Sequence, residues 1–180
     1  MFSKIYEGKR VLVIGHTGFK GSWLTLWLSQ LGAKIAGFAN SVPSNPSLYE
    51  IMKLEDRITH YHGDIKDIAR VKQVFTEFAP EIVFHLAAKA IVRECLEDPV
   101  EAFYTNVMGS IHIFEAIRQC DSIQSAVIIT SDKCYENVEW EYGYREIDQL
   151  GGKDPYSASK AAVEIAFSAI NSFNTRKTVS

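Results

Sequence analysis

The sequence has little cysteine, little net charge and no long apolar run. Its 180 residues include three cysteines, Cys95, Cys120 and Cys134, which form no CxxC pair. An odd and scattered set of this kind predicts neither a disulfide framework nor a zinc site. His60 and His62 fall two residues apart in an expected strand and so share one side of it. With no third ligand beside them, we expect two surface histidines and no metal.

The balance of charge excludes further classes of partner. Lys and Arg number 19 and Asp and Glu number 22, which gives a formal net charge of -3. General nucleic-acid binding requires a basic face, so we expect no nucleic-acid partner. No apolar stretch approaches the length of a membrane span, and residues 1–10 lack the apolar centre and cleavage site of a secretory signal. We therefore expect no membrane partner and a cytoplasmic protein.

The composition is that of an ordinary globular domain. Apolar residues make up 47% of the chain and charged residues 23%, and 180 residues suffice for one well-buried core. Neither internal repeats nor low-complexity segments interrupt the sequence. We expect a single domain over residues 1–180.

Apolar runs alternate with stretches of helical periodicity along the chain. The expected strands are residues 10–14, 34–38, 58–62, 81–86 and 126–129. The expected helices are residues 22–31, 66–78, 98–118 and 154–172. Strands without polar alternation, separated by helices, indicate a parallel sheet that helices cover on both faces. The pattern predicts an α/β fold with a doubly wound parallel sheet (a Rossmann fold), in which ligands bind at the carboxyl ends of the strands.

A glycine-rich turn follows the first expected strand. The stretch GHTGFKGSWL, residues 15–24, has glycines at 15, 18 and 21. Gly15 would permit the turn, Gly18 would let the backbone approach a pyrophosphate, and Gly21 would let the next helix pack closely on the sheet. The N–H groups near Phe19 and Lys20 would then point at the anion from the helix N-terminus. A plain tight turn between strand and helix is the alternative, but the strand before and the helix after favour a dinucleotide site.

The residues after the second expected strand bear on the choice of dinucleotide. An acidic residue there would bind the adenosine 2′-hydroxyl group, whereas an arginine would suit a 2′-phosphate. This chain has Asn40 and Ser41, with no basic residue before Lys53. An amide can bond a hydroxyl group, and no cation is available for a phosphate, so NAD is favoured over NADP.

Two short motifs further along suggest acid–base chemistry. Ser131, Asp132 and Lys133 follow the last expected strand, and YSASK at residues 156–160 opens the last expected helix. Tyr156 and Lys160 are spaced i, i+4 and share one helix face. A nearby ammonium group favours the ionised phenolate, which makes Tyr156 a usable base for a sugar hydroxyl group. An ordinary exposed pair is the alternative reading of the same spacing.

Eight stretches together carry a family resemblance over nearly the whole chain. They are GHTGFKGSWL (15–24), NPSLYEI (45–51), HGDI (62–65), EIVFHLAA (81–88), TNVMG (105–109), TSDKCYEN (130–137), GYRE (143–146) and GGKDPYSASK (151–160). With these stretches the chain resembles the extended short-chain dehydrogenase/reductase family, and within it the CDP-glucose 4,6-dehydratases. The resemblance implies a lyase that converts CDP-glucose to CDP-4-keto-6-deoxyglucose for polysaccharide biosynthesis, with NAD as cofactor.

The resemblance also implies a role for each residue of the two motifs. Tyr156 takes the proton from the sugar O4 as hydride leaves C4 for the cofactor. Lys160 sustains the phenolate and binds the nicotinamide ribose, and Ser131 hydrogen-bonds O4. Asp132 protonates the departing O6 hydroxyl group, and a base near Lys133 removes the C5 proton. Because a cation disfavours a neutral carboxylic acid beside it, the division of labour between Asp132 and Lys133 stays open.

Further cofactor positions follow from the same resemblance. They are Asp64, Ile65, Leu86, Ala87, Ala88 and Asn106. Asp64 and its neighbour match an adenine-contacting site, although an aspartate that caps a helix is the alternative. The three residues from 86 match a small-residue wall beside the cofactor, which close packing would explain equally. Asn106 matches a residue that links the active-site lysine to solvent, and an asparagine inside a helix otherwise costs helix propensity.

Length and association complete the expectations. The family continues beyond this point with a C-terminal substrate domain, so we expect a truncated, weakly active chain. A non-catalytic NAD-binding or dimerising module, and an epimerase or reductase of the same family, are the alternatives. The resemblance implies a homodimer through helices 98–118 and 154–172. Apolar candidates for that interface are Phe103, Val107, Phe114, Val163, Phe167 and Ile170.

Overall fold

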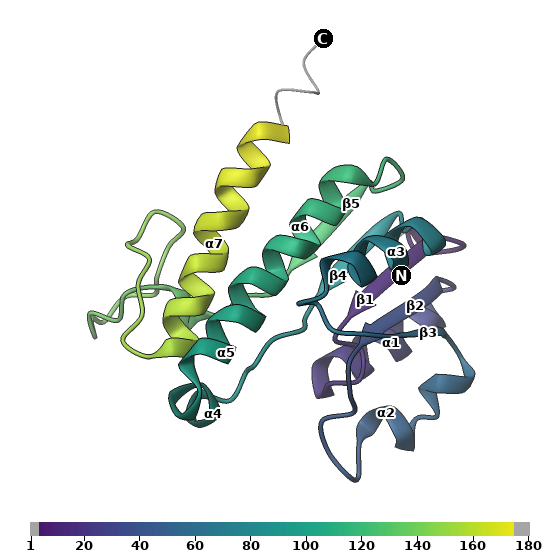
Figure 1. The fold of residues 1–180 in the computed structure, drawn as a ribbon, viewed down its shortest axis with the longest axis horizontal. Helices are drawn as coiled ribbons and strands as arrows, with labels where there is room; N and C mark the ends of the chain where they lie inside the picture. The colour runs from purple at the N-terminus through teal and green to yellow at the C-terminus, as the bar shows by residue number, and fades with distance from the viewer. Residues whose placement is uncertain (1–3, 175–180) are drawn as a thin grey trace. The chain divides into compact units, whose positions relative to one another are not determined.

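The computed structural model describes the backbone of residues 4–174 and the side chains of residues 4–170 (Figure 1). These residues form two compact units. The first unit contains residues 4–87 and 115–129, and the second contains residues 88–114 and 130–174. The first unit contains the glycine turn, and the second contains Ser131, Asp132, Lys133, Tyr156 and Lys160.

The first unit is built on a parallel sheet of five strands. They are β1 (Arg10–Ile14), β2 (Lys34–Ala39), β3 (Thr59–His62), β4 (Ile82–His85) and β5 (Ser125–Ile128). The strand order is β3-β2-β1-β4-β5, and every neighbouring pair is parallel (Figure 1). The chain therefore moves outward from β1 in one direction and then in the other, which with right-handed crossovers is a doubly wound sheet. The expected Rossmann fold is confirmed.

Buried apolar side chains hold the strands against helix α1 (Phe19–Gln30). Val11 and Val13 are fully buried and cluster with Leu28 of α1 and with Ile35 and Ile82 of the neighbouring strands. The register pairs Val11 with both Ile35 and Ile82, so these side chains share one sheet face. Burial of each such side chain contributes about 1.5–3 kcal/mol, which makes β1 the centre of the core.

Two helices of the first unit begin at residues other than those expected. Helix α1 begins three residues earlier, because Gly18 takes the extended conformation of an N-cap. Helix α3 (Ile68–Phe78) begins two residues later than expected. The carboxylate of Asp67 caps α3 by accepting hydrogen bonds from Ala69 N–H (3.0 Å) and Arg70 N–H (3.1 Å). The short helices α2 (Leu48–Ile51) and η2 (Leu54–Asp56) lie between β2 and β3 in the sequence.

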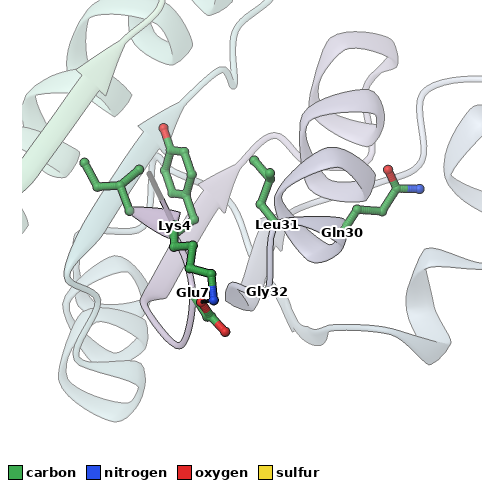
Figure 2. Close-up of a pocket in the computed structure, with 7 residues that line it drawn as sticks. Lys4, Glu7, Gln30, Leu31 and Gly32 are labelled. Atoms are coloured by element: carbon green, nitrogen blue, oxygen red, sulfur yellow. Dashed lines mark ion pairs between the residues drawn. The ribbon is translucent and has the colours of Figure 1, made fainter. Parts of the chain in front are cut away.

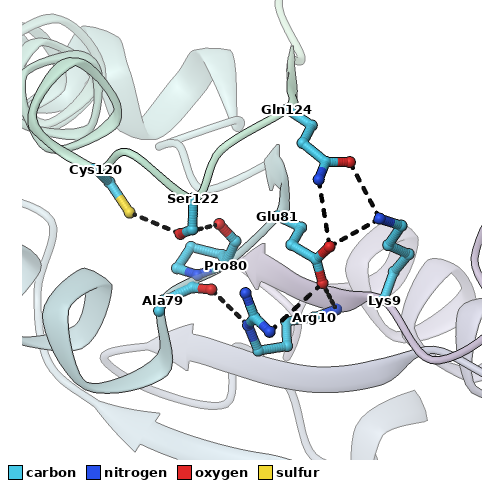
Figure 3. Close-up of polar contacts among 8 residues, drawn as sticks. All are labelled: Lys9, Arg10, Ala79, Pro80, Glu81, Cys120, Ser122 and Gln124. Carbon is cyan, nitrogen blue, oxygen red and sulfur yellow. Dashed lines mark hydrogen bonds and ion pairs between the residues drawn. The ribbon is translucent and has the colours of Figure 1, made fainter.

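A polar network joins the amino-terminal ends of three strands (Figure 3). The Glu81 carboxylate accepts hydrogen bonds from Lys9 Nζ (2.8 Å) and from Arg10 N–H (3.1 Å). Lys9 Nζ also donates to Gln124 Oε1 (3.1 Å). The hydrogen bond from Lys9, with that from the Arg10 backbone, lowers the pKa of Glu81. These contacts stabilise the end of the sheet at which the strands begin, opposite their carboxyl ends.

A shallow pocket of about 280 Å³ lies at this same amino-terminal end of the strands (Figure 2). Its lining residues are Lys4, Ile5, Tyr6, Glu7, Gln30, Leu31 and Gly32. They precede β1 and β2 in the sequence, whereas doubly wound sheets bind ligands beyond the carboxyl ends of their strands. The pocket is therefore separate from the expected cofactor site.

The second unit is helical. It contains α4 (Val92–Glu97), α5 (Pro99–Phe103), the π-helical turn η3 (Tyr104–Met108), the start of α6 (Gly109–Gln119), the short helix η4 (Asp132–Cys134) and α7 (Pro155–Asn174). Asp98 caps α5 by accepting a hydrogen bond from Glu101 N–H (3.0 Å), and Pro99 takes the first helical position. Helix α7 packs against α4, α5, η3 and η4. No helix within residues 4–174 is long and apolar enough to cross a membrane.

The helix expected over residues 98–118 is present, and it contains a π-helical turn. The π-helical turn η3 separates α5 from α6, and Asn106 in this turn is 1% exposed. A π-helical turn inserts an extra residue into a helix and redirects the side chains around it. Here it allows the amide of Asn106 to bond inward.

Candidate functional site

The glycine turn of the first unit uses its three glycines in different ways. A Cβ atom at Gly15, where φ is +88°, would lie 2.7 Å from Ala87 N. At Gly21 it would lie 2.1 Å from the Gly15 carbonyl oxygen. At Gly18 the nearest atom would be that same oxygen at 3.4 Å, an ordinary contact. The fold itself therefore requires Gly15 and Gly21, whereas Gly18 leaves an open approach to the turn.

The first turn of α1 suits an anion. Within the described residues, no side chain caps α1 and no acidic residue lies in its first turn. Phe19 and Lys20 are exposed at this end of the helix. Unpaired N–H groups at a helix N-terminus carry partial positive charge and bind phosphate groups well. The residues present therefore fit the pyrophosphate of a dinucleotide.

Asn40 and Asp64 lie together at the ends of β2 and β3. Asn40 Nδ2 donates a hydrogen bond to Asp64 Oδ2 (3.2 Å), and Asp64 Oδ1 accepts one from Lys66 N–H (2.9 Å). Asp64 does not cap α3, because Asp67 does, so the alternative of a helix cap is wrong. The Lys66 ammonium group lies 3.6 Å from Asp64 Oδ2, and sequence reasoning missed this cation because it counted only residues before Lys53.

The wall at the end of β4 packs directly against the glycine turn. Leu86 N–H donates a hydrogen bond to the Ile14 carbonyl oxygen (2.8 Å). The Leu86 and Ala87 backbone is what a Cβ atom at Gly15 would strike. Close packing against the glycine turn therefore explains the positions of Leu86 and Ala87. The same packing is compatible with a cofactor beside these residues. Ala88 belongs to the second unit, and Ile65 is 6% exposed in the first.

Sequence reasoning missed a histidine pair beneath the turn. His16 is fully buried, and its Nε2 lies 2.9 Å from Nδ1 of His60. The ring of Tyr49 meets the His16 ring edge-on, with centroids 5.3 Å apart. A Cβ atom at Gly37 would lie 2.4 Å from the His16 ring. A glycine inside an apolar strand, which marks a close approach by another group, was the available signal.

The second unit brings the two acid–base motifs together, because η4 packs against α7. Ser131 caps η4: its Oγ accepts a hydrogen bond from Lys133 N–H (3.2 Å) and donates one to Asp132 Oδ1 (3.0 Å). The side chains of Asp132 and Lys133 are exposed. Helix α7 carries Tyr156 and Lys160 in its first turns.

The start of α7 is fixed by Asp154. Its carboxylate accepts hydrogen bonds from Ser157 N–H (3.0 Å) and Ser157 Oγ (2.6 Å). Partial burial opposes ionisation, but these hydrogen bonds prevail and lower the pKa of Asp154. Ser159 Oγ donates to the Tyr156 carbonyl oxygen (2.7 Å). The first turn of α7, and with it Tyr156, is held in a defined position.

Asn106 clamps the backbone of Lys89. Its Oδ1 accepts a hydrogen bond from Lys89 N–H (2.8 Å), and its Nδ2 donates to the Lys89 carbonyl oxygen (3.1 Å). Nδ2 also donates to Ser159 Oγ (2.9 Å). Both the oxygen and the nitrogen of the buried amide therefore join the segment after β4 to Ser159, the residue before Lys160. This pairing explains why an asparagine stands inside a helical segment.

Lys160 is the most perturbed charged group of the second unit. It is 6% exposed, and burial lowers its pKa from 10.5 to about 8, although Glu164 and Cys95 act in the opposite direction. Glu164 in turn accepts a hydrogen bond from Thr130 Oγ1. Lys160 follows Tyr156 by one helical turn, so the two residues share one face of α7.

We expect Lys160→Met to stabilise the fold. The lowered pKa means that the folded state binds the Lys160 proton less tightly than the unfolded chain does. The free energy of unfolding is therefore highest above pH 10.5 and falls as the pH drops to about 8. Removal of the charge should raise the free energy of unfolding at pH 7 by about 1–3 kcal/mol.

The measurement is urea denaturation at pH 7 and pH 10. The exposed Lys153 offers the matched control Lys153→Met, which we expect to change the free energy of unfolding by less than about 0.5 kcal/mol. The advantage of Lys160→Met should shrink at the higher pH. A less stable Lys160→Met variant at pH 7 would contradict the prediction.

Across residues 4–174, no group of three or more His, Cys, Asp or Glu side chains is arranged to hold a metal ion. The free cysteines are Cys95, Cys120 and Cys134. Burial raises the pKa of the Cys95 thiol and also that of Cys134.

Comparisons with known proteins agree with this geometry. A family model described as GDP-mannose 4,6 dehydratase matches residues 12–178. A CDP-glucose 4,6-dehydratase of Salmonella typhimurium is 52% identical over 169 residues, which are 93% of this chain and 47% of that protein. A UDP-glucose 4-epimerase of Yersinia enterocolitica is 31% identical over 86% of this chain and 46% of its own.

Solved structures lead to the same group. The crystal structure of the Thermus thermophilus UDP-glucose 4-epimerase in complex with NAD superposes with a TM-score of 0.80 at 31% identity. The match covers 91% of this chain and 51% of that one. The chain thus spans about half the length of the relatives that it matches. Its sequence match and its doubly wound sheet together place the chain in the GDP-mannose 4,6 dehydratase family, among the extended short-chain dehydrogenase/reductases.

Proposed function

We propose that this chain carries the cofactor-binding and proton-transfer parts of an NAD-dependent nucleotide-sugar 4,6-dehydratase, a lyase that acts on CDP-glucose. The observation that carries the proposal is the second unit, where Ser131, Asp132 and Lys133 pack against the helix that bears Tyr156 and Lys160. The 52% identity to a protein named CDP-glucose 4,6-dehydratase supports the substrate. We propose a cytoplasmic location, which agrees with such a substrate.

The dinucleotide would lie at the glycine turn of the first unit. Gly18 and the first N–H groups of α1 would hold its pyrophosphate. Asn40 and Asp64 would contact the adenosine half of the dinucleotide. Ile65 and the residues from Leu86 to Ala88 would pack against the apolar surfaces of the dinucleotide. When bound, the nicotinamide supplies a temporary acceptor for hydride from the sugar. In the second unit, Tyr156 and Lys160 would bind the nicotinamide ribose.

The contacts of Asn40 support NAD over NADP. Its amide is hydrogen-bonded to the Asp64 carboxylate, so a negative charge already stands beside it. A 2′-phosphate would be repelled by this carboxylate, whereas a 2′-hydroxyl group could donate to either side chain. The Lys66 ammonium group lies 3.6 Å from Oδ2 of the same carboxylate.

The proton chemistry falls to residues of the second unit. Tyr156 would take the O4 proton of the sugar, helped by the buried ammonium group of Lys160. Ser131, at the exposed start of η4, would hydrogen-bond O4 and orient the hydroxyl group. A ketone at C4 acidifies the C5 proton, and loss of that proton then expels the O6 hydroxyl group once it is protonated.

Asp132 and Lys133 share that elimination in our proposal. Asp132 Oδ1 accepts a hydrogen bond from Ser131 Oγ, so this carboxyl oxygen acts as an acceptor at the exposed start of η4. This arrangement suits a group that removes a proton better than one that donates a proton. We therefore propose a second division of roles, in which Asp132 removes the C5 proton and the Lys133 ammonium group donates a proton to O6.

An epimerase is the second candidate, because UDP-glucose 4-epimerases recur among the relatives. Epimerisation needs no acid for O6, so exposed Asp132 and Lys133 side chains favour dehydration. A non-catalytic NAD-binding module would use Lys160 at the ribose but would need neither Asp132 nor Lys133, which are exposed. The deciding experiment incubates the purified protein with NAD and either CDP-glucose or UDP-glucose. A 4-keto-6-deoxy product, seen by alkaline absorbance and mass, supports dehydration, and a 4-epimer contradicts it.

We also propose a homodimer formed through the helices of the second unit. Exposed apolar side chains on α5, η3 and α7 include Val100 (78% exposed), Tyr104 (47%) and Ile165 (59%). Phe114 and Val163, which were interface candidates, are instead buried within their unit, so they cannot contribute. Light scattering should give the mass of two chains, and a monomer at micromolar concentration would contradict the proposal.

A further inference from the structure

The pair of His16 and His60 spans three strands beneath the glycine turn. His16 lies two residues after the end of β1, and His60 lies in β3. Gly37 of β2 pairs with Val13 on one side and with His60 on the other. The His16 ring occupies the space that a Gly37 side chain would fill and so reaches across β2. One hydrogen bond of 2.9 Å therefore ties the turn to a strand two positions away in the sheet.

Both histidine rings of the pair are neutral near pH 7, because the pKa of each is lowered from 6.5. Burial, followed by the charge of His60, lowers the pKa of His16 to about 4. Burial and the neighbouring His62 also lower the pKa of His60, and Glu55 opposes them. Two neutral imidazoles within hydrogen-bond distance share one N–H between them. Among the other groups that face the pair, Tyr49 has a pKa raised by burial and then by Glu55 and Asp56, so it is a neutral phenol.

Two more side chains hold the same part of the turn. Thr17 Oγ1 donates a hydrogen bond to the Ser41 carbonyl oxygen (2.7 Å), and Ser22 Oγ donates to the His16 carbonyl oxygen (3.0 Å). Residues 16 and 17 are thus anchored to β3, to the loop after β2 and to α1. These anchors use side-chain groups and carbonyl oxygen atoms, so they do not compete with a ligand for the first N–H groups of α1.

We propose that the His16–His60 pair is a positioning element that holds the glycine turn in its dinucleotide-binding form before the ligand arrives. The proposal rests on the proposed function, because it concerns the same site. A binding loop that is already ordered loses less conformational entropy when the ligand binds. Loss of the pair should therefore weaken binding of the pyrophosphate-bearing half of the cofactor, with no direct contact removed.

The experiment measures ADP-ribose binding by isothermal titration calorimetry at pH 7.5 and 15 °C. ADP-ribose carries the adenosine and pyrophosphate without the nicotinamide, so it reports on the first unit. We expect His60→Leu to weaken binding about tenfold, because it leaves His16 Nε2 without its partner. His60→Asn should stay within about threefold of the unmodified protein, since its amide can still donate to that nitrogen. His62→Leu, an exposed histidine of the same strand, is the matched control and should bind unchanged.

The outcomes separate the two claims. If the unmodified protein binds neither ADP-ribose nor NAD, the proposed function fails and this inference fails with it. If it binds both, and His60→Leu melts earlier yet binds ADP-ribose with unchanged affinity, the pair is only structural and the inference alone is overturned. Should His60→Leu fail to fold, His60→Ala takes its place with the same expected weakening. Equal affinities for the alanine and asparagine variants would likewise overturn the inference.

Discussion

Tyr156→Phe should reduce formation of the 4-keto product about 10²–10⁴-fold, the range that loss of a general acid–base group usually costs. The change removes one oxygen atom from the first turn of α7 and leaves the Asp154 cap, the Ser159 bond and the burial of Lys160 in place. Without its phenolic oxygen, residue 156 can no longer take the O4 proton. The measurement is product formation from CDP-glucose at saturating substrate, with NAD affinity determined in parallel.

The control for this prediction is Tyr142→Phe. Tyr142 also belongs to the second unit and is 77% exposed, so the same loss of a hydroxyl group should leave the rate unchanged. NAD affinity of Tyr156→Phe should fall by no more than about threefold, since one hydrogen bond to the ribose is lost. Product formation by Tyr156→Phe within tenfold of the unmodified protein would show that another group accepts the proton.

Gly21→Ala should destabilise the first unit by about 3 kcal/mol or more, because an added methyl group in a packed site costs about 1–3 kcal/mol even where side chains can shift. At Gly21 the obstacles are backbone atoms: a Cβ atom would lie 2.1 Å from the Gly15 carbonyl oxygen and 2.8 Å from His16 Cα. Relief would require the turn to open or α1 to move away from the sheet. Thermal unfolding monitored by circular dichroism is the measurement, and we expect a large drop in the melting temperature or no folded protein.

Alanine substitutions at two other glycines serve as controls for Gly21→Ala. Gly143 has no atom within 4 Å of an added Cβ atom, so Gly143→Ala should melt within about 2 °C of the unmodified protein. Gly18→Ala meets only an ordinary contact at 3.4 Å and should also fold, but its methyl group would occupy the approach of the pyrophosphate. A Gly21→Ala variant as stable as Gly143→Ala would contradict the close packing between α1 and the turn.

The amino-acid pattern alone was sufficient for the features that depend on neighbours in the chain. The five strands and α7 lie within two residues of the expected bounds, because apolar runs and helical periodicity are local patterns. The parallel sheet followed from the alternation of strands with helices. The glycine turn and the spacing of Tyr156 and Lys160 were also visible, since each is a short-range pattern.

Boundary errors arose where local signals competed. Helix α3 begins at Ile68 because Asp67, and not the earlier Asp64, accepts the free N–H groups. The helix expected over residues 98–118 continues through the π-helical turn η3, where Asn106 bonds to Lys89, 17 residues away in the sequence. No helical periodicity encodes such a bond.

The sequence by itself determined the fold class, the glycine turn and the candidate chemistry of Ser131, Asp132, Lys133, Tyr156 and Lys160. Only the tertiary structure decided which groups these residues meet. The bond between Asn40 and Asp64 and the pair of His16 and His60 join residues 24 and 44 positions apart. The lowered pKa of Lys160 likewise depends on burial by several elements packed around α7. Contacts of this kind arise when distant segments pack, and burial, which sets the strength of each charge and hydrogen bond, exists only in the folded chain.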